Sequence, residues 1–184
     1  RFFEDAYIDR NTVSSVMVRA GVGDAPVTAT KISSGQLDVT LYATDSTLAP
    51  GNRTSLVFDV VPRKGMHLYA PGAGHYKVIG LTLTPQPFVT VDPMRYPASE
   101  RYTFKPLNET VPVFVKPFRL IQPLHVEATP QAQAALRDKT SLTVSGSLDY
   151  QACDDKVCYN PSSIPVSWTF NLRALITERP VPQR

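Results

Sequence analysis

Residues 141–172 read SLTVSGSLDYQACDDKVCYNPSSIPVSWTFNL and decide the fold. Apolar side chains alternate with polar ones on both sides of the central stretch, at Leu142, Val144, Leu148 and Tyr150 before it and at Ile164, Val166, Trp168, Phe170 and Leu172 after it. This period of two predicts two half-buried strands joined as a β-hairpin, with Trp168 in the core. Both cysteines of the chain, Cys153 and Cys158, fall in or beside the connection, close enough to bond.

Similar alternation recurs upstream of this hairpin. The segments with strand character are residues 37–41, 56–60, 66–69, 78–83, 88–91, 111–120 and 124–128. The 17 prolines of the chain suit short strands with stiff connections. One short helix is predicted at Thr129–Arg137, where Thr129 is the N-cap and Pro130 takes the first helical position. The pattern therefore predicts an all-β, immunoglobulin-like β-sandwich with one short inserted helix.

The two ends of the chain are predicted to lie outside this sandwich, which spans residues 37–172. Residues 1–23 are predicted to form a short N-terminal helix, because Val13, Val16 and Met17 fall on one helical stripe. Two interpretations stay open for it: a helix packed on the sandwich, or the last helix of a preceding domain. Residues 24–36 are predicted as a linker and residues 173–184 as a frayed tail.

Composition excludes several classes of protein. The net charge is +3 and the basic residues are scattered along the chain, which argues against a nucleic-acid binder. Apolar runs stay shorter than the ~18 residues of a transmembrane helix, so we expect no membrane span. The chain opens on Arg1-Phe2-Phe3 without the pattern of a signal peptide, and we expect it to be a fragment of a longer protein.

The cysteine pair has two interpretations. As a structural staple it closes a loop of only six residues, which stabilises a fold by about 2 kcal/mol, against about 4.5 kcal/mol for a loop of about seventy residues. A domain of this size does not need so small a contribution, which favours a redox-active pair. Asp154 and Asp155 disfavour a thiolate at Cys153, while Lys156 partly offsets them. Exchange would then depend on a docked partner.

Other chemistries find little support in the sequence. A zinc site needs four ligands and the cysteine pair offers two, while His67, His75 and His125 are isolated from one another. We therefore expect no metal and no other cofactor. A serine hydrolase would need a Gly-x-Ser-x-Gly frame, and the chain does not contain one.

Two pieces of the sequence carry a family resemblance. The run from Tyr150 to Pro161, YQACDDKVCYNP, resembles the cysteine signature of the N-terminal periplasmic domain of the thiol:disulfide interchange protein DsbD, Tyr-Gln-x-Cys followed by Cys-Tyr/Leu-x-Pro. The upstream run from Lys64 to Tyr69, KGMHLY, is similar to that family's Gly-aromatic-x-Leu/Ile-Tyr strand. The resemblance covers about residues 37–172. The opening run from Arg1 to Tyr7, RFFEDAY, with the predicted helix after it, resembles the tail of a redoxin domain of thioredoxin-like or peroxiredoxin-like type.

The resemblance implies a function and a site. Such a domain receives electrons from a thioredoxin-like or redoxin donor and passes them to oxidised exported proteins, in the periplasm or another exported location. Cys158 would form the mixed disulfide and Cys153 would resolve it. His67, where many relatives have Tyr or Trp, would add pH sensitivity. The other residues expected to line the site are Tyr69, Phe104, Tyr150, Asp154 and Tyr159.

The long connection at residues 92–108 is expected to be irregular and to act as a cap. The resemblance implies a cap loop within residues 102–108, with Phe104 as the aromatic shield over the cysteines. The alternative is an ordinary surface loop whose Phe104 fills a core edge. For the whole domain, the rival function is a non-catalytic protein-binding sandwich in which the disulfide is a local clamp.

Overall fold

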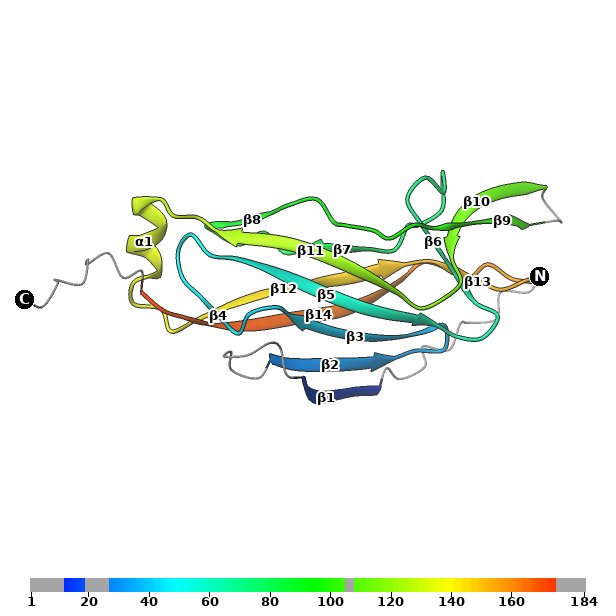
Figure 1. Ribbon diagram of the computed structural model, residues 1–184. Helices are drawn as coiled ribbons and strands as arrows, with labels where there is room; N and C mark the ends of the chain where they lie inside the picture. The colour runs from blue at the N-terminus through cyan, green and yellow to red at the C-terminus, as the bar shows by residue number, and fades with distance from the viewer. Residues whose placement is uncertain (1–11, 19–26, 105–107, 175–184) are drawn as a thin grey trace, which may run out of the picture.

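The computed structural model describes residues 12–18, 27–104 and 108–174, and these form an elongated all-β domain (Figure 1). The longest sheet contains, in spatial order, β1 (Thr12–Val18), β2 (Val27–Ser33), β3 (Leu37–Ala43), β5 (Arg53–Pro62), β11 (Phe118–Val126) and β8 (Val89–Val91). The second contains β4 (Thr47–Leu48), β14 (Ser162–Leu172), β12 (Ser141–Tyr150) and β7 (Gly80–Leu83). Neighbouring strands pair antiparallel except β4 and β14.

The core lies between these two sheets, as the sequence pattern requires. Residues of one parity are buried along β3, β12 and β14, and the intervening residues are more exposed. The ring of Phe58 on β5 meets Trp168 on β14 edge-to-face, with centroids 5.6 Å apart. The predicted hairpin of β12 and β14 and the core position of Trp168 are confirmed. The domain is an immunoglobulin-like all-β fold.

A third, smaller sheet extends one end of the sandwich. It contains β13 (Ala152–Cys153), β6 (His67–Tyr69), β10 (Glu109–Phe114) and β9 (Glu100–Phe104), in that spatial order. Strands of the large sheets lead directly into it: β5 is followed by β6, and β12 by β13. Figure 1 shows this small sheet at the end of the molecule opposite the helix. The cysteines therefore sit at one tip of the sandwich, on a sheet anchored in its core.

The first part of the chain differs from the sequence prediction. Thr12–Val18 forms strand β1 rather than a helix, and Val27–Ser33 forms strand β2 within the predicted linker. The helical spacing in this part competes with its content of β-branched residues, which favour strands, and β3 offers β2 a free edge for pairing. Residues 1–11 and 19–23, the rest of the predicted helix, lie outside the described residues, as do residues 175–184 of the predicted tail.

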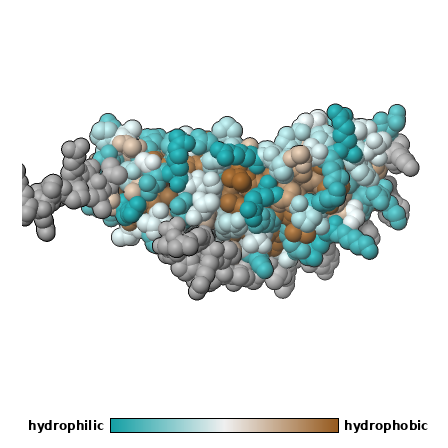
Figure 2. Space-filling model, in the orientation of Figure 1, coloured by the Kyte–Doolittle hydropathy of each residue, from teal (hydrophilic) through white to brown (hydrophobic). Residues whose placement is uncertain are grey.

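The inserted helix is confirmed. α1 spans Pro130–Leu136, and its N-cap Thr129 accepts a hydrogen bond from the backbone N–H of Ala132 at 3.1 Å. In the part of the chain described, no helix is long and apolar enough to cross a membrane. Figure 2 shows hydrophobic side chains reaching the surface along the middle of one face, bordered by hydrophilic ones.

Candidate functional site

The two cysteines form a disulfide across a miniature antiparallel ladder. The backbone N–H of Tyr159 donates to the carbonyl of Ala152 at 3.0 Å, and that of Asp154 donates to Val157 at 2.9 Å. Cys153 and Cys158 are thus a directly opposed pair between these bonds, where antiparallel strands approach most closely. Their Cα atoms are 4.1 Å apart, which brings the two sulfurs into bonding range.

Asp154 orders the turn between the cysteines. Its Oδ1 accepts hydrogen bonds from the backbone N–H groups of Lys156 and Val157, each at 2.7 Å, and its Oδ2 accepts one from the hydroxyl of Tyr159 at 3.1 Å. The two backbone donors lower the pKa of Asp154, with a smaller contribution from Tyr159. This short side chain thereby fixes a four-residue turn that would otherwise be free to change shape.

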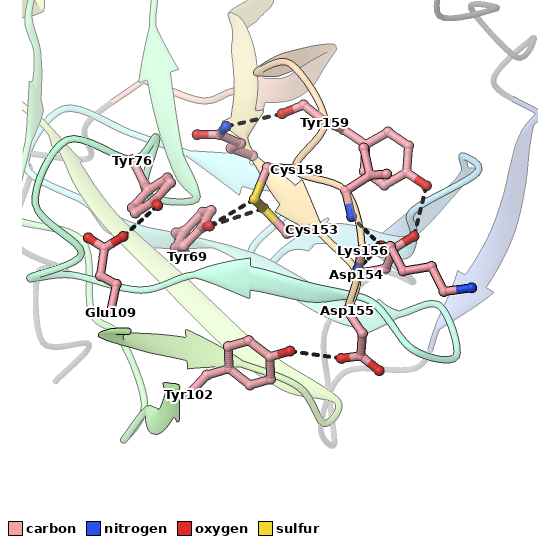
Figure 3. Close-up of a disulfide and its surroundings, with 12 residues drawn as sticks. Tyr69, Tyr76, Tyr102, Glu109, Cys153, Asp154, Asp155, Lys156, Cys158 and Tyr159 are labelled. Atoms are coloured by element: carbon pink, nitrogen blue, oxygen red, sulfur yellow. Dashed lines mark hydrogen bonds between the residues drawn. A yellow bond between two sulfur atoms is a disulfide. The ribbon is translucent and has the colours of Figure 1, made fainter. Parts of the chain in front are cut away.

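Strand β6 brings Tyr69 and His67 to the disulfide. Cys153 on β13 pairs with His67, so the side chains of the two strands share one small sheet. The hydroxyl oxygen of Tyr69 lies 3.0 Å from the sulfur of Cys153 and 3.4 Å from that of Cys158 (Figure 3). Burial raises the pKa of the Tyr69 hydroxyl well above its usual value, so it keeps its hydrogen.

A second tyrosine and a carboxylate stand behind Tyr69. The rings of Tyr69 and Tyr76 stack almost parallel, with an angle of 8° and centroids 4.1 Å apart. The hydroxyl of Tyr76 donates to Oε2 of Glu109 at 2.8 Å, at the start of β10. This hydrogen bond raises the pKa of Tyr76. Figure 3 shows the carboxylate, the two phenols and the disulfide following one another in space.

Tyr102 joins β9 to the cysteine turn. Its hydroxyl donates to Oδ1 of Asp155 at 2.7 Å (Figure 3). Its ring lies against that of His67, with centroids 4.3 Å apart. It also packs against the buried cluster that contains Cys153 and Tyr69. One side chain on β9 therefore contacts both the strand and the turn that hold the disulfide.

The two cysteines differ in exposure to solvent. Cys153 is 1% exposed, whereas Cys158 is exposed, and so is its neighbour Val157 at 51%. Attack of a thiolate on a disulfide requires access to one sulfur along the bond. Of the two cysteines, Cys158 is therefore the more accessible to an incoming thiolate.

The other predicted site residues are placed as follows. Asp154 lies in the turn and Tyr159 donates a hydrogen bond to it. Tyr150 points into the core, and its hydroxyl donates to Oε1 of Gln36 at 3.0 Å. Residues 100–104 form strand β9, so the prediction of an irregular connection was wrong there. Phe104 ends this strand opposite Glu109, and within the described structure Tyr102 is the residue of β9 that packs beside Cys153.

Two residues of the cluster were missed from the sequence. Tyr76 lies in the loop after β6, and Glu109 begins β10, 33 positions later. Neither stands in a motif, and only the pairing of β10 with β6 brings them together. Tyr102 was inside the predicted cap, but its position gave no sign that it, rather than Phe104, faces the cysteine turn.

Comparison with known protein families identifies the family of this domain. A search among curated protein sequences found no match. A search of solved structures gave the N-terminal periplasmic domain of ScsB from Proteus mirabilis, at 13% identity and a TM-score of 0.49, covering 73% of this chain and 47% of that one. The family model for the N-terminal domain of the thiol:disulfide interchange protein DsbD matches residues 38–167, more than half of the chain. The chain therefore belongs to the family of DsbD N-terminal domains.

Proposed function

We propose that this domain carries reducing equivalents through the Cys153–Cys158 pair, from a thioredoxin-like or redoxin donor to oxidised exported proteins in the periplasm. Membership of the DsbD N-terminal family supports thiol–disulfide exchange as the chemistry. The observation that carries the proposal is the unequal exposure of the pair, one sulfur open to a partner and the other buried beside a phenol. A staple needs no such asymmetry.

The exchange proceeds in two displacements. A donor thiolate attacks the sulfur of Cys158, a mixed disulfide forms, and the electron pair of the broken bond stays on Cys153 as a thiolate. The second thiol of the donor, as its thiolate, then attacks the donor's sulfur in the mixed disulfide. A disulfide forms within the donor, which dissociates, and Cys158 is released as a thiolate. Toward an acceptor the order reverses: the Cys158 thiolate attacks the acceptor disulfide, and Cys153 resolves the mixed disulfide, which restores the pair.

The surroundings of the pair make exchange depend on docking. Asp154 and Asp155 lie next to Cys153 in the turn and disfavour a thiolate there. Burial of Cys153 has the same effect. A domain built in this way reacts slowly with small thiols and disulfides, and a partner that covers the turn changes both access and local charge.

The rival function is a protein-binding sandwich with a structural clamp. Substitution of one cysteine at a time separates the two functions. Cys153→Ser leaves the exposed Cys158 free to attack, so we expect it to accumulate a mixed disulfide with an oxidised thioredoxin-like protein, visible on a non-reducing gel. Cys158→Ser leaves only the buried sulfur, and we expect at least tenfold less of the adduct, since rates of exchange follow access.

Two other outcomes of this trapping experiment would contradict the proposal. Equal trapping by both variants would contradict the assigned roles of the two sulfurs. No trapping by either, from protein that is folded and has one reactive thiol per chain, would favour the clamp. Wild-type protein treated in parallel is the control, because its second cysteine resolves the adduct.

A further inference from the structure

The segment that carries Cys158 forms the outer edge of the small sheet. Strand β13 is the last strand in the order of that sheet, and Cys158 is bridged to Cys153 on β13. Within the described structure, no strand pairs with the other side of residues 157–159. Cys158 is exposed at this edge. One side of the exposed cysteine is therefore held by the ladder, and the other side is open.

The hydrogen bonds of the ladder determine which backbone groups face the open side. The N–H of Tyr159 donates to Ala152, and the C=O of Val157 accepts from Asp154, so both groups point toward β13. Along an antiparallel strand, successive residues direct their N–H and C=O groups to alternate sides. The N–H and the C=O of Cys158 therefore both point away from β13. Among the residues that the structure describes, neither group has a hydrogen-bond partner.

The exchange reaction brings a thiolate to the same side. The bond between the two sulfurs runs across the ladder, from Cys153 on β13 to Cys158 at the edge (Figure 3). A thiolate attacks along this bond, from beyond the sulfur that it reaches. For Cys158, that approach comes from the open edge. The part of a partner that delivers the thiolate therefore passes beside two backbone groups that lack partners.

Free backbone groups at a sheet edge fit one kind of ligand, an extended polypeptide. A single residue that runs antiparallel satisfies both groups of Cys158, because such a pair exchanges two hydrogen bonds. The Cα atoms of the pair are then about 5.5 Å apart, a separation that a disulfide can span, so the pairing is compatible with a mixed disulfide. Val157, 51% exposed and next along the edge, offers the same segment an apolar contact.

We propose that the exchange partner docks by β-augmentation: an extended segment of a thioredoxin-like protein pairs antiparallel with residues 157–159 and exchanges two hydrogen bonds with the backbone of Cys158. This inference rests on the proposed function and deepens it, because it states how the partner is recognised. The chemical step is unchanged. A bond forms between the partner's sulfur and that of Cys158, the bond to Cys153 breaks, and the electron pair leaves on Cys153. A thiol without peptide groups reacts at the same sulfur but cannot form this pairing.

The first test measures amide hydrogen exchange by NMR in two adducts of the Cys153→Ser domain. In one, Cys158 is activated with 5-thio-2-nitrobenzoate and coupled to a thioredoxin-like protein that retains one active-site cysteine. In the other, it is coupled to 2-mercaptoethanol. We expect the amide of Cys158 to exchange about tenfold more slowly in the protein adduct, because a hydrogen-bonded amide is protected. The amide of Asp155, in the same turn and without a partner among the described contacts, is the reference for simple burial.

The second test removes the N–H of Cys158 and keeps its sulfur. The junction between Ala152 and Cys153 permits native chemical ligation of residues 1–152 to a synthetic peptide of residues 153–184 that carries N-methylcysteine at position 158. We expect a reduced thioredoxin-like protein to reduce this disulfide about threefold to tenfold more slowly than that of the ligated protein with ordinary cysteine, since one hydrogen bond is lost. Reduction by 2-mercaptoethanol should proceed at the same rate in both ligated proteins.

Several results would overturn the proposal. They are equal exchange of the Cys158 amide in the two adducts, equal slowing of the Asp155 amide, and an N-methyl variant that is slowed with both reductants or with neither. If the N-methyl protein did not fold, the exchange measurement would decide alone. Failure here is distinct from failure of the proposed function. Trapping by Cys153→Ser asks whether Cys158 reacts with a partner, whereas the coupled adduct is made chemically and shows how a partner is held.

Discussion

His67 stands closest in register to Cys153, and its burial decides how it behaves. It is 4% exposed and pairs with Cys153 between β6 and β13. Burial lowers the pKa of its imidazole, while the charges of Asp155 and Asp154 offset part of this effect. The ring is therefore neutral at neutral pH, and its uncharged face lies against Tyr102. The pH sensitivity expected from the sequence stays a prediction.

That prediction has a definite sign. Because the pKa of His67 is lower in the folded state than in the unfolded chain, the unfolded chain binds a proton first as the pH falls. We expect stability to decrease between about pH 7 and about pH 5, and His67→Tyr to remove part of that decrease. Urea unfolding across this range measures it. His75→Gln, at an exposed histidine eight positions along, is the control.

A pH dependence that is identical in wild type and His67→Tyr would contradict the assignment. A loss of the dependence in His75→Gln would assign it to the exposed histidine instead. Carboxylates that titrate at the lower end of the range contribute equally to all three proteins. The comparison therefore isolates the one buried imidazole.

At the same scale, the sequence predicted residues within motifs and missed residues between them. Cys153, Cys158 and Tyr69 belong to two motifs, and the structure brings them together. Tyr150 belongs to the same motif as the cysteines, but it lies on the inward face of its strand, so its ring enters the core. Glu109 has no motif, and only the fold places it beside Tyr76, whose ring stacks on that of Tyr69. Spacing along a strand predicts which face a residue takes, but not which distant strand it meets.

Among the elements, we expect the β9–β10 hairpin to govern access to the disulfide. Its two strands pair along their length, and β10 pairs in turn with β6 beneath the site. Tyr102 is the point where this hairpin contacts the cysteine turn, through Asp155 and His67. We therefore expect Tyr102, two residues before Phe104, to act as the cap, through its hydrogen bond to Asp155 and its ring contact with His67.

We expect Tyr102→Ala to increase the rate at which the reduced cysteines react with a small thiol reagent by about tenfold, because access limits the reaction. Tyr102→Phe keeps the ring contact and should give a smaller increase. Thr103→Ala, at the exposed neighbouring position, is the matched control. Stopped-flow labelling of the freshly reduced domain measures all three rates.

Phe104→Ala decides between the two aromatic residues. If it accelerated labelling more than Tyr102→Ala at unchanged stability, the sequence-based choice of Phe104 as the shield would be right. If Tyr102→Ala labelled no faster than Thr103→Ala, the hairpin would not limit access at all. Urea unfolding of each variant distinguishes faster labelling from a loss of fold.

Elements also differ in how well they could be predicted. Helix α1 carries its own capping residue, so local sequence was sufficient. Strands β12 and β14 alternate strongly and are joined by a short connection. The sequence of strand β1 combines a helical spacing of apolar residues with β-branched residues that favour a strand. Its pairing with β2 decides in favour of the strand. Tertiary pairing outweighs local propensity where the local signals disagree.

For the whole molecule, the sandwich core provides the stability and the disulfide provides little. The core joins both large sheets, whereas the bond closes a loop of six residues at the tip. Such a short loop restrains the unfolded chain by about 2 kcal/mol. A domain of this kind has a total stability of about 5 to 15 kcal/mol. The bond is therefore free to break and re-form without unfolding the protein that carries it.

We expect reduction of the wild-type domain to lower its free energy of unfolding by no more than about 2 kcal/mol, since only the restraint on a short loop is lost. Urea unfolding of the oxidised and reduced forms measures this difference with every side chain in place. The Cys153→Ala, Cys158→Ala double variant should match the reduced form, apart from the small cost of removing a buried sulfur at Cys153. A loss above about 4 kcal/mol on reduction would favour the structural clamp, because a carrier must remain folded in both redox states.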